Sequence, residues 1–432
     1  MQITISMNVN VCLPDNEKVP IEAIEYSLKN QNLDAKVLEQ VLTAIDAKLV
    51  TIQCGEKYSK DQSNRRYRRA GTSRKTVITS VGPVTIPVNK VRDTERNRVT
   101  KPLYDRVQFA GKHRYQTSVS MISVDFAQKM SYRDTVEELS LVIREVPSRM
   151  TINNLVKEFG KSIGIGTGGK STRVLMADGT KAHSQEPGVK QNEINVALGI
   201  NDDNKILLGV TVNQKWERLA EKLGDEKMLS EEAVIVCDGE TELRNAFSSG
   251  NIQFQTDLIH GFRILGYKLW EDSALNLNGR KAIINDLKML LLSLKNVVVY
   301  HKYEPDRISD KINQVVDGME SLSARLMDLG CHKAAKFLNE YSNTLVTFAR
   351  LAIHGIKIPW NSNRIERLMG EISKRVKHKW MRWTTEGLET ILKLILVRYT
   401  SPERYKNFRD TKLGLISGSM ISVQISVNHS VQ

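Results

Sequence analysis

The sequence predicts an α/β fold with a mixed sheet, and three observations support this prediction. Short strand-like segments follow one another between residues 173 and 258, joined first by tight turns and then by helices. An almost entirely helical tract runs from residue 264 to residue 355. A last amphipathic helix is predicted at residues 361–377. We therefore expect a sheet domain that is interrupted by a helical segment.

The strands are predicted from apolar runs that are bounded by turn residues. They are Arg173–Ala177, Ile194–Ile200, Ile206–Val212, Ala233–Cys237 and Ile252–Leu258, with helices at Trp216–Leu223 and Glu242–Phe247. The resulting order is β-β-β-α-β-α-β. Three strands joined by hairpins, followed by strands joined by helices, are typical of a mixed sheet of the ribonuclease-H type. Here an all-helical insertion interrupts it.

The chain ahead of the sheet is predicted to contain helices and one β-hairpin. Apolar residues recur at helical spacing over residues 16–50, and a strand-like pattern covers residues 76–91. Residues 116–160 predict three short helices, and Ser131 with Asp134 forms a capping signal for the second. These helices suit a helix-turn-helix, and a plain helical linker domain fits the same pattern equally well.

Positive charge is the unusual feature of the composition, and two segments hold most of it. The 432 residues include 63 Lys and Arg against 49 Asp and Glu, a net charge of +14. Residues 56–115 hold 16 basic residues against 5 acids, and residues 361–383 hold 7 against 2. Guanidinium groups match phosphate geometry, so we expect nucleic acid rather than a membrane as the partner; an ordinary solvated surface is the alternative. The candidate DNA contacts are Arg65, Arg66, Arg68, Arg69, Arg74 and Lys75 in the first segment and Arg364, Arg367, Lys374, Arg375 and Lys377 in the second.

The cysteines indicate a reducing compartment. Cys12, Cys54, Cys237 and Cys331 are far apart in the sequence and form no CxxC pair or zinc-ligand pattern. Residues 1–10 lack the features of a signal peptide, and the uninterrupted apolar runs are too short to span a bilayer. We therefore expect a cytoplasmic, nucleoid-associated protein.

A glycine-rich run at residues 164–171 matches the G-x-x-x-x-G-K-[ST] pattern of a phosphate-binding loop. Such a loop follows a strand and opens a helix. Here a predicted helix precedes the run and a predicted strand follows it. The flanking elements are in the wrong order, and a linker at residues 164–170 is favoured over an ATP site.

Two predicted strands end in the same way, in Asp178-Gly179 and in Asp238-Gly239. A carboxylate at the carboxyl end of a strand stands at the rim of the sheet, where α/β proteins build their sites. Two carboxylates held close together repel unless a cation lies between them, and Mg²⁺ suits such a pair. The alternative is that each Asp-Gly pair is only a turn.

A third acid is expected from the helix at residues 361–377. Glu366 lies near its start, and basic residues surround it. An acid in the first turn is also favoured by the helix dipole, so a purely structural role is the alternative. Glu371 is the rival candidate.

The order and spacing of four motifs resemble those of the DDE transposases of prokaryotic insertion sequences, in the branch related to Mutator-like elements. The motifs are Met176-Ala177-Asp178-Gly179, Val236-Cys237-Asp238-Gly239, Asp257-Leu258-Ile259-His260 and Ser362-Asn363-Arg364-Ile365-Glu366, the last followed by basic residues and Trp380-Met381-Arg382-Trp383. The resemblance covers about residues 56–400. It implies a ribonuclease-H-like core with a helical insertion between the second Asp and the Glu.

The resemblance also implies a mechanism and partners. Asp178, Asp238 and Glu366 would be catalytic residues that bind two Mg²⁺ ions, with Mn²⁺ as a possible substitute, and His260 would contact DNA near the reacting phosphate. Trp360, Trp380 or Trp383 would stack on an unpaired base or pack in the core. The partners would be double-stranded DNA, as terminal inverted repeats and as target, and a second copy of the chain.

Two other functions use the same residues. A ribonuclease-H-like nuclease or resolvase would share the acids but would not join strands. A DNA-binding protein derived from a transposase would have lost catalysis, although all three acids are present here.

The chain is thus expected to divide into eight regions. They are an N-terminal helical region (1–55), a basic β-hairpin DNA-binding region (56–115), a helix-turn-helix-like region (116–163), a linker (164–170), the first part of the core (171–262), the helical insertion (263–355), the second part of the core with the catalytic Glu helix (356–410) and a tail (411–432).

Overall fold

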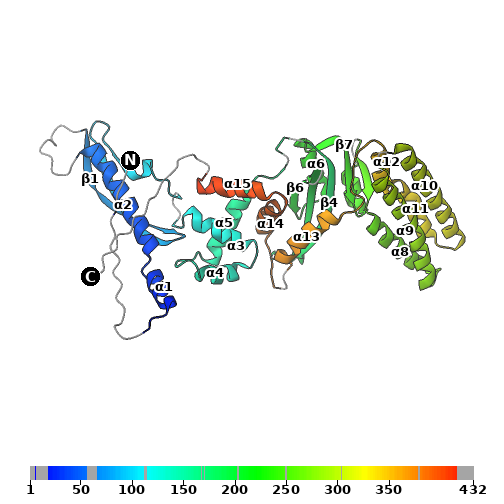
Figure 1. Ribbon diagram of the computed structural model, residues 1–432, viewed down its shortest axis with the longest axis horizontal. Helices are drawn as coiled ribbons and strands as arrows, with labels where there is room; N and C mark the ends of the chain where they lie inside the picture. Colours follow the sequence, from blue (N-terminus) through cyan, green and yellow to red (C-terminus); the bar gives the residue numbers. More distant parts are fainter. Residues whose placement is uncertain are drawn as a thin grey trace. The chain divides into compact units, whose positions relative to one another are not determined.

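A computed structural model describes the chain in two compact units (Figure 1). The residues it describes are 5, 18–55, 66–110, 114–166, 168–169, 171–201, 204–248, 251–302, 304–377 and 380–415. The first unit lies within Met1–Val156 and Phe408–Gln432, and the second lies within Lys157–Asn407.

The first unit contains the predicted hairpin and the predicted helices. Its elements are α1 (Ile21–Asn30), α2 (Leu33–Cys54), β1 (Tyr67–Thr79), β2 (Gly82–Asp93), β3 (Arg98–Thr100), a 3₁₀ turn (Pro102–Asp105), α3 (Thr117–Ala127), α4 (Tyr132–Ser140) and most of α5 (Arg149–Ser162). The capping prediction is confirmed, because Ser131 Oγ accepts a hydrogen bond from the backbone N–H of Asp134 at 3.1 Å. The hairpin is longer than predicted, and β1 extends back through the arginine-rich run.

Helix α2 packs on one face of this hairpin. Leu42 of α2 belongs to the same apolar cluster as Val84, Ile86 and Val88 of β2. The buried Asp46 of α2 accepts hydrogen bonds from the backbone N–H and side chain of Asn89 at 2.9 and 2.6 Å. The basic residues of β1 do not share one face, because Lys75 pairs with the buried Ile86 whereas Arg74 pairs with Pro87.

The second unit is built on a five-stranded mixed sheet. Its strands are β4 (Thr172–His183), β5 (Gln191–Asn201), β6 (Asn204–Val212), β7 (Leu229–Cys237) and β8 (Gln253–Thr256), with α6 (Trp216–Asp225) and α7 (Thr241–Ala246) between the later ones. The spatial order is β6-β5-β4-β7-β8. The first three strands are antiparallel, whereas β7 and β8 run parallel to β4. The predicted order of strands and helices is confirmed.

The predicted end of the first strand at Asp178 is wrong. Strand β4 continues to His183, because β5 pairs with it from Val174 through Asp178 to its last residue. Its pairing with β7 stops at Met176, one residue before β7 ends at Cys237. Asp178 is therefore inside a strand, not in a turn, but it lies level with the point where the neighbouring strand ends.

The two faces of the sheet are covered differently. Leu219 and Leu223 of α6 and Leu243 of α7 pack with Leu175 and Ile235 of the sheet in one buried cluster. On the other face, α13 (Asn363–Val376) contacts β4 and α14 (Thr385–Thr400) contacts β6 (Figure 1). The helix α13 thereby passes the level of Asp178.

The helical insertion follows β8. It consists of α8 (Leu258–Asp272), α9 (Leu277–Tyr300), α10 (Pro305–Asp328), α11 (His332–Leu345) and α12 (Thr347–Ile353). Helices α11 and α12 contact β8, the edge strand of the sheet. Helix α15 (Pro402–Leu413) ends the described chain.

The predicted surroundings of the glycine-rich run are confirmed on both sides. Helix α5 ends at Ser162 and β4 begins at Thr172, so the run joins a helix to a strand. Thr167 and Lys170 lie outside the described residues. Within the described part of the chain, every helix is either too short or too polar to cross a lipid bilayer.

Candidate active site

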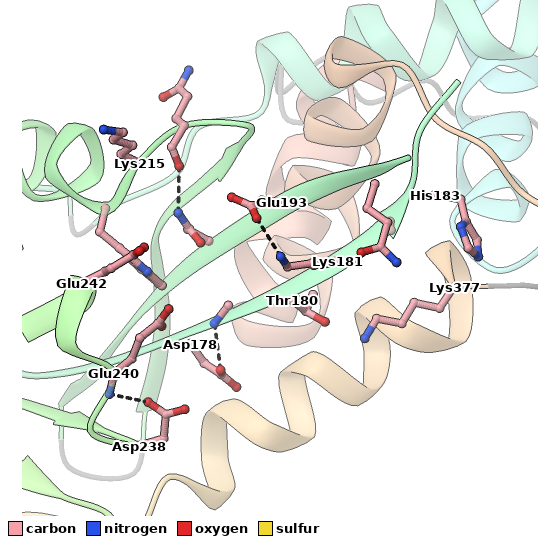
Figure 2. Close-up of a pocket in the computed structure, with 16 residues that line it drawn as sticks. Asp178, Thr180, Lys181, His183, Glu193, Lys215, Asp238, Glu240, Glu242 and Lys377 are labelled. Carbon is pink, nitrogen blue, oxygen red and sulfur yellow. Dashed lines mark hydrogen bonds and ion pairs between the residues drawn. The ribbon is translucent and has the colours of Figure 1, made fainter. Parts of the chain in front are cut away.

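A groove of about 920 Å³ runs across the sheet near the ends of β7 and β4 (Figure 2). Its walls are lined almost entirely by polar and charged side chains. Acids from β4, β5 and the turn after β7 face lysines from β4, the chain before α6 and the end of α13. The charged residues lining it are Asp178, Glu193, Asp238, Glu240, Glu242, Lys181, Lys215 and Lys377.

The structure brings the two predicted aspartates together. Parallel pairing of Met176 with Val236 sets Asp178 of β4 level with Asp238, which follows β7. Both carboxylates point into the same groove (Figure 2). Asp178 Oδ1 accepts the N–H of Gly179 at 2.8 Å, and Asp238 Oδ1 accepts the N–H of Glu240 at 3.1 Å. The other oxygen of each carboxylate accepts no hydrogen bond from the described residues.

Asp178 carries the clearest electrostatic signature in the groove. Burial, followed by repulsion from Asp238, raises its pKa to about 6, and Glu366 adds further repulsion. The N–H of Gly179 and the charge of His260 oppose this rise. A raised carboxyl pKa means that the ionised form is poorly compensated by the protein itself.

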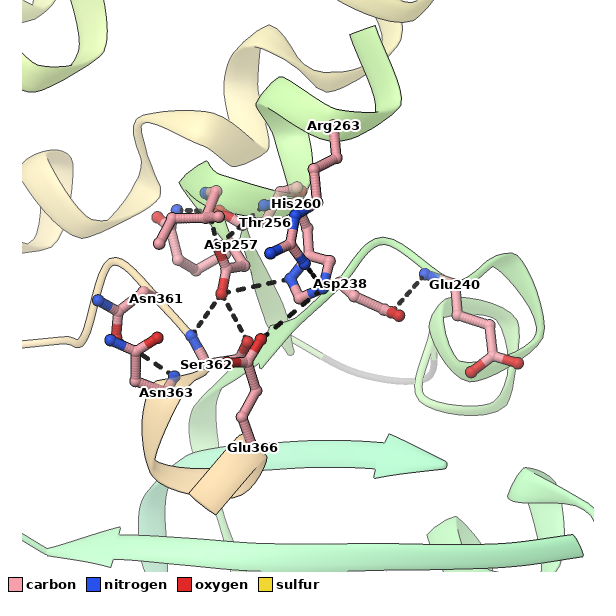
Figure 3. A network of polar contacts seen from close by, with 12 residues as sticks. Asp238, Glu240, Thr256, Asp257, His260, Arg263, Asn361, Ser362, Asn363 and Glu366 are labelled. Atoms are coloured by element: carbon pink, nitrogen blue, oxygen red, sulfur yellow. Dashed lines mark hydrogen bonds and ion pairs between the residues drawn. The ribbon is translucent and has the colours of Figure 1, made fainter. Parts of the chain in front are cut away.

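Glu366 reaches this region from α13. It lies in the first turn of the helix, and its side chain is 45% exposed. Ile365, Leu368 and Ile372 of the same helix are fully buried and fix which face Glu366 occupies. Glu366 Oε1 lies 3.8 Å from His260 Nε2 (Figure 3). The rival, Glu371, is instead paired with Lys374 at 2.7 Å.

His260 is placed between the acids by the first turn of α8. Its Nε2 faces Glu366, and its Nδ1 lies 3.5 Å from Asp257 Oδ2 (Figure 3). The pKa of His260 is raised, first by its contact with Asp257 and then by the charges of Asp257, Asp238 and Glu366, while burial opposes the rise. The imidazole is therefore biased toward its protonated form.

Asp257 is a site residue whose role the sequence did not reveal. Its side chain is 1% exposed. Its Oδ1 caps α8 by accepting the N–H groups of Ile259 and His260 at 2.6 and 3.1 Å. Its Oδ2 accepts the N–H and hydroxyl of Ser362 at 2.6 and 2.5 Å, just before α13 (Figure 3). Burial alone would raise the pKa of Asp257, but the contacts with His260 and Ser362 lower it overall.

Two acid sets could be considered for a metal ion. Ligand atoms of Asp257, His260 and Glu366 lie within 4.8 Å of one another. Both oxygens of Asp257 are already occupied by donors, so Asp257 is poorly suited to coordinate an ion. Asp178, Asp238 and Glu366 supply oxygen ligands and unbalanced negative charge, which are the properties that Mg²⁺ requires. The donor chemistry of this second set therefore suits a divalent cation, whereas the first set is the one whose ligand atoms lie within 4.8 Å of one another.

The basic residues of α13 do not behave alike. Arg367 is exposed, and Lys377 is exposed and lines the groove. Arg364 and Arg367 lie close enough to Lys205 of β6 to help lower its pKa, after burial. Lys374 is engaged with Glu371. Of the predicted DNA contacts on α13, Arg367, Lys374 and Lys377 are therefore exposed, and Lys377 also lines the groove.

The predicted phosphate contact of Arg375 is not supported. The residue is 3% exposed, and its guanidinium lies 4.8 Å from the ring centre of Trp383. Trp383 is itself buried and donates its Nε1–H to the carbonyl of Val376 at 3.2 Å. Both residues pack the end of α13, whereas Trp380 is 84% exposed. Sequence spacing could not separate them, because all three lie within one basic run.

The basic hairpin of the first unit shows a similar division. Arg66 is paired with Asp93 at 2.9 Å and with Glu95 at 3.0 Å. Arg68, Arg69 and Arg74 are exposed on β1, and Lys75 is partly exposed. Arg65 lies outside the described residues.

Comparison with protein families shows which family the chain resembles. Residues 15–401 match the family described as "Transposase, Mutator family". A search of the curated proteins finds no match.

Proposed function

The chain belongs to the Mutator family of transposases, and on that basis we propose that Asp178, Asp238 and Glu366 form its catalytic triad. In this proposal the protein cuts the DNA at the ends of its element and joins those ends to target DNA. The observation that carries it is the electrostatic coupling of the three carboxylates, which come from β4, from the turn after β7 and from α13. Asp178 and Asp238 line one groove, and Glu366 lies close enough to Asp178 to help raise its pKa.

The sheet supports a ribonuclease-H-like core. Its strand order places three antiparallel strands beside two parallel ones, with β4 in the centre. The acids lie where the central strand passes the end of its parallel neighbour. One proposed catalytic carboxylate is therefore carried by the central strand, and a second one directly follows its parallel neighbour β7.

The triad would hold two Mg²⁺ ions, with Mn²⁺ as a substitute. When bound, such ions activate a water or a 3′-hydroxyl and stabilise the leaving oxygen of an in-line displacement. A bound cation would favour the ionised form of Asp178, because it would offset the burial and the repulsion from Asp238 that raise the pKa of Asp178. Glu366, in the first turn of α13, would supply the third carboxylate.

His260 and Lys377 would stabilise the negative charge of the DNA phosphates. His260 is biased toward the protonated state and can donate from Nε2 to a phosphate oxygen beside Glu366. Lys377 lines the same groove as the aspartates and supplies a positive charge there. Both residues stabilise negative charge that develops on the phosphate during displacement.

The first unit would recognise the element ends. Its hairpin exposes Arg68, Arg69 and Arg74 on a strand, and arginines arranged in this way suit a row of phosphates. The helices α3–α5 would complete this end-binding region. Because the protein must hold two ends at once, we propose that it acts as a dimer or a larger assembly, which sedimentation with and without end DNA would show.

The test is cleavage and joining of terminal inverted-repeat DNA with Mg²⁺, and again after chelation by EDTA. Asp178→Asn, Asp238→Asn and Glu366→Gln should each abolish both steps while binding of end DNA persists. Glu371→Gln is the matched control, because this acid lies on the same helix but is paired with Lys374. Wild-type activity in any triad variant would remove that residue from the site. Cleavage without joining would identify a nuclease or resolvase instead.

A further inference from the structure

The helical insertion is attached to the sheet by a row of specific polar contacts. Thr344 Oγ1 lies 2.8 Å from Thr256 Oγ1, and the hydroxyl of Thr347 donates to the carbonyl of Phe254 at 2.8 Å. The N–H of Phe348 donates to the side chain of Gln255 at 2.6 Å. The start of α12 and the end of α11 therefore cover the edge strand β8 in a defined register.

One contact of the insertion reaches past this edge to the proposed site. The hydroxyl of Tyr341, on α11, donates to the carbonyl of Gly239 at 3.2 Å. Gly239 directly follows Asp238 and has a φ of +95°, a conformation that favours glycine. A Cβ atom at this position would lie 3.2 Å from the ring of Tyr341, so the ring and the turn are closely packed.

Tyr341 is itself held firmly in place. Its ring stacks on Phe337 with centroids 4.9 Å apart, and the guanidinium of Arg244 lies 4.8 Å from its centroid. Arg244 belongs to α7, the helix that begins just after the turn. The hydroxyl therefore acts from a fixed point on the insertion.

We propose that Tyr341 is a positioning residue through which the helical insertion orients the carboxylate of Asp238. This inference rests on the proposed function, in which Asp238 binds Mg²⁺. The turn after β7 has one local bond to the side chain of Asp238, donated by the N–H of Glu240 at 3.1 Å. The hydroxyl of Tyr341 adds an anchor from outside the sheet. Without that anchor the turn rotates more freely, and Asp238 spends less time in the orientation that binds the ion.

Tyr341→Phe removes only the hydroxyl and keeps the packed ring. The first measurement is hydrogen exchange of the backbone amides of residues 238–241 in the full chain without metal. The second is the Mg²⁺ concentration that gives half of the maximal thermal protection, without DNA. The third is the Mg²⁺ concentration that gives half-maximal cleavage. Tyr300→Phe is the matched control, because this tyrosine lies on α9 of the same insertion and is 77% exposed.

In Tyr341→Phe we expect the exchange rate of the amides of residues 238–241 to rise about fivefold, which is the effect of one lost hydrogen bond. Both half-maximal Mg²⁺ concentrations should rise by the same factor. The cleavage rate at saturating Mg²⁺ should change less than about twofold, and the Tyr300→Phe variant should match the wild type. Unchanged exchange and unchanged Mg²⁺ requirements would overturn the proposal. So would faster exchange across the whole insertion with a lower melting temperature, because Tyr341 would then serve general packing. A wild-type protein that neither binds Mg²⁺ nor cleaves would contradict the proposed function, whereas the exchange experiment needs neither.

Discussion

Two aspartates in the second unit have opposite environments. Asp257, at the junction of α8 and α13, is buried and accepts four hydrogen bonds from N–H and O–H groups, and its pKa is lowered. Asp178, on the central strand β4, is partly buried and accepts one hydrogen bond, and its pKa is raised to about 6 by burial and by the charges of Asp238 and Glu366. The charge of Asp257, which joins two helices, is thus compensated by hydrogen bonds. The charge of Asp178, which we propose as a catalytic residue, is not.

The largest expected effect is the loss of DNA cleavage when Asp178 is replaced. Asp178→Asn should reduce cleavage at least about 1,000-fold, because the variant cannot supply an anionic ligand. At neutral pH and without metal the same variant should be more stable than the wild type, by up to about 3 kcal/mol, because it removes a poorly compensated buried charge. Cleavage assays and urea unfolding in EDTA measure the two effects. A variant that is inactive and also less stable would show that Asp178 is structural.

Asp257→Ala should destabilise the protein, in contrast to Asp178→Asn. Removing this carboxylate leaves the N–H groups of α8 and Ser362 without their acceptor and should cost about 3–5 kcal/mol of unfolding free energy. Urea unfolding measures the loss, and Asp272→Ala is a milder comparison, because Asp272 is only partly buried and accepts two N–H groups at the start of α11. If Asp257→Ala loses activity but less than about 1 kcal/mol of stability, Asp257 belongs with the catalytic acids instead.

The two acids should also respond to pH with opposite signs. The folded pKa of Asp178 is raised from 3.8 to about 6. The wild type should therefore lose stability relative to Asp178→Asn as the pH rises from about 4 to about 6, and should change little above that. The folded pKa of Asp257 is lowered, so its contribution is present above pH 3.8 and is lost as the pH falls. Urea unfolding of the wild type and both variants between about pH 2 and about pH 7, without metal, checks both slopes, and slopes of equal sign would contradict the contrast.

The smallest effects are expected for two arginines, of which one is exposed and one is buried. Arg74 is exposed on the hairpin, and Arg74→Ala should lower the salt dependence of end binding by about one unit of slope without changing stability. Arg375 is buried against Trp383. Arg375→Ala should cost about 1–3 kcal/mol of unfolding free energy and leave the salt dependence unchanged. Binding titrations at several salt concentrations, with urea unfolding beside them, would reveal a reversal of these two roles.

The sequence by itself determined the order of the elements and singled out the three acids that we propose as the catalytic residues. Local patterns carry this information, because apolar spacing distinguishes helix from strand within a few residues. The amphipathic pattern of α13 likewise fixed the helix that presents Glu366. The positive charge of the hairpin was also readable, since composition does not depend on pairing.

Only the tertiary structure decided how each of these residues is used. Asp178 looks like a strand end until β5 pairs beyond it to Gln191. Asp257 looks like part of a motif until Ser362, 105 residues later in the chain, donates to it. Tyr341 carries no signal at all before α11 brings its hydroxyl to Gly239. Each outcome depends on a partner that is distant in sequence, and burial by that partner sets whether a charge is satisfied, exposed or left unbalanced.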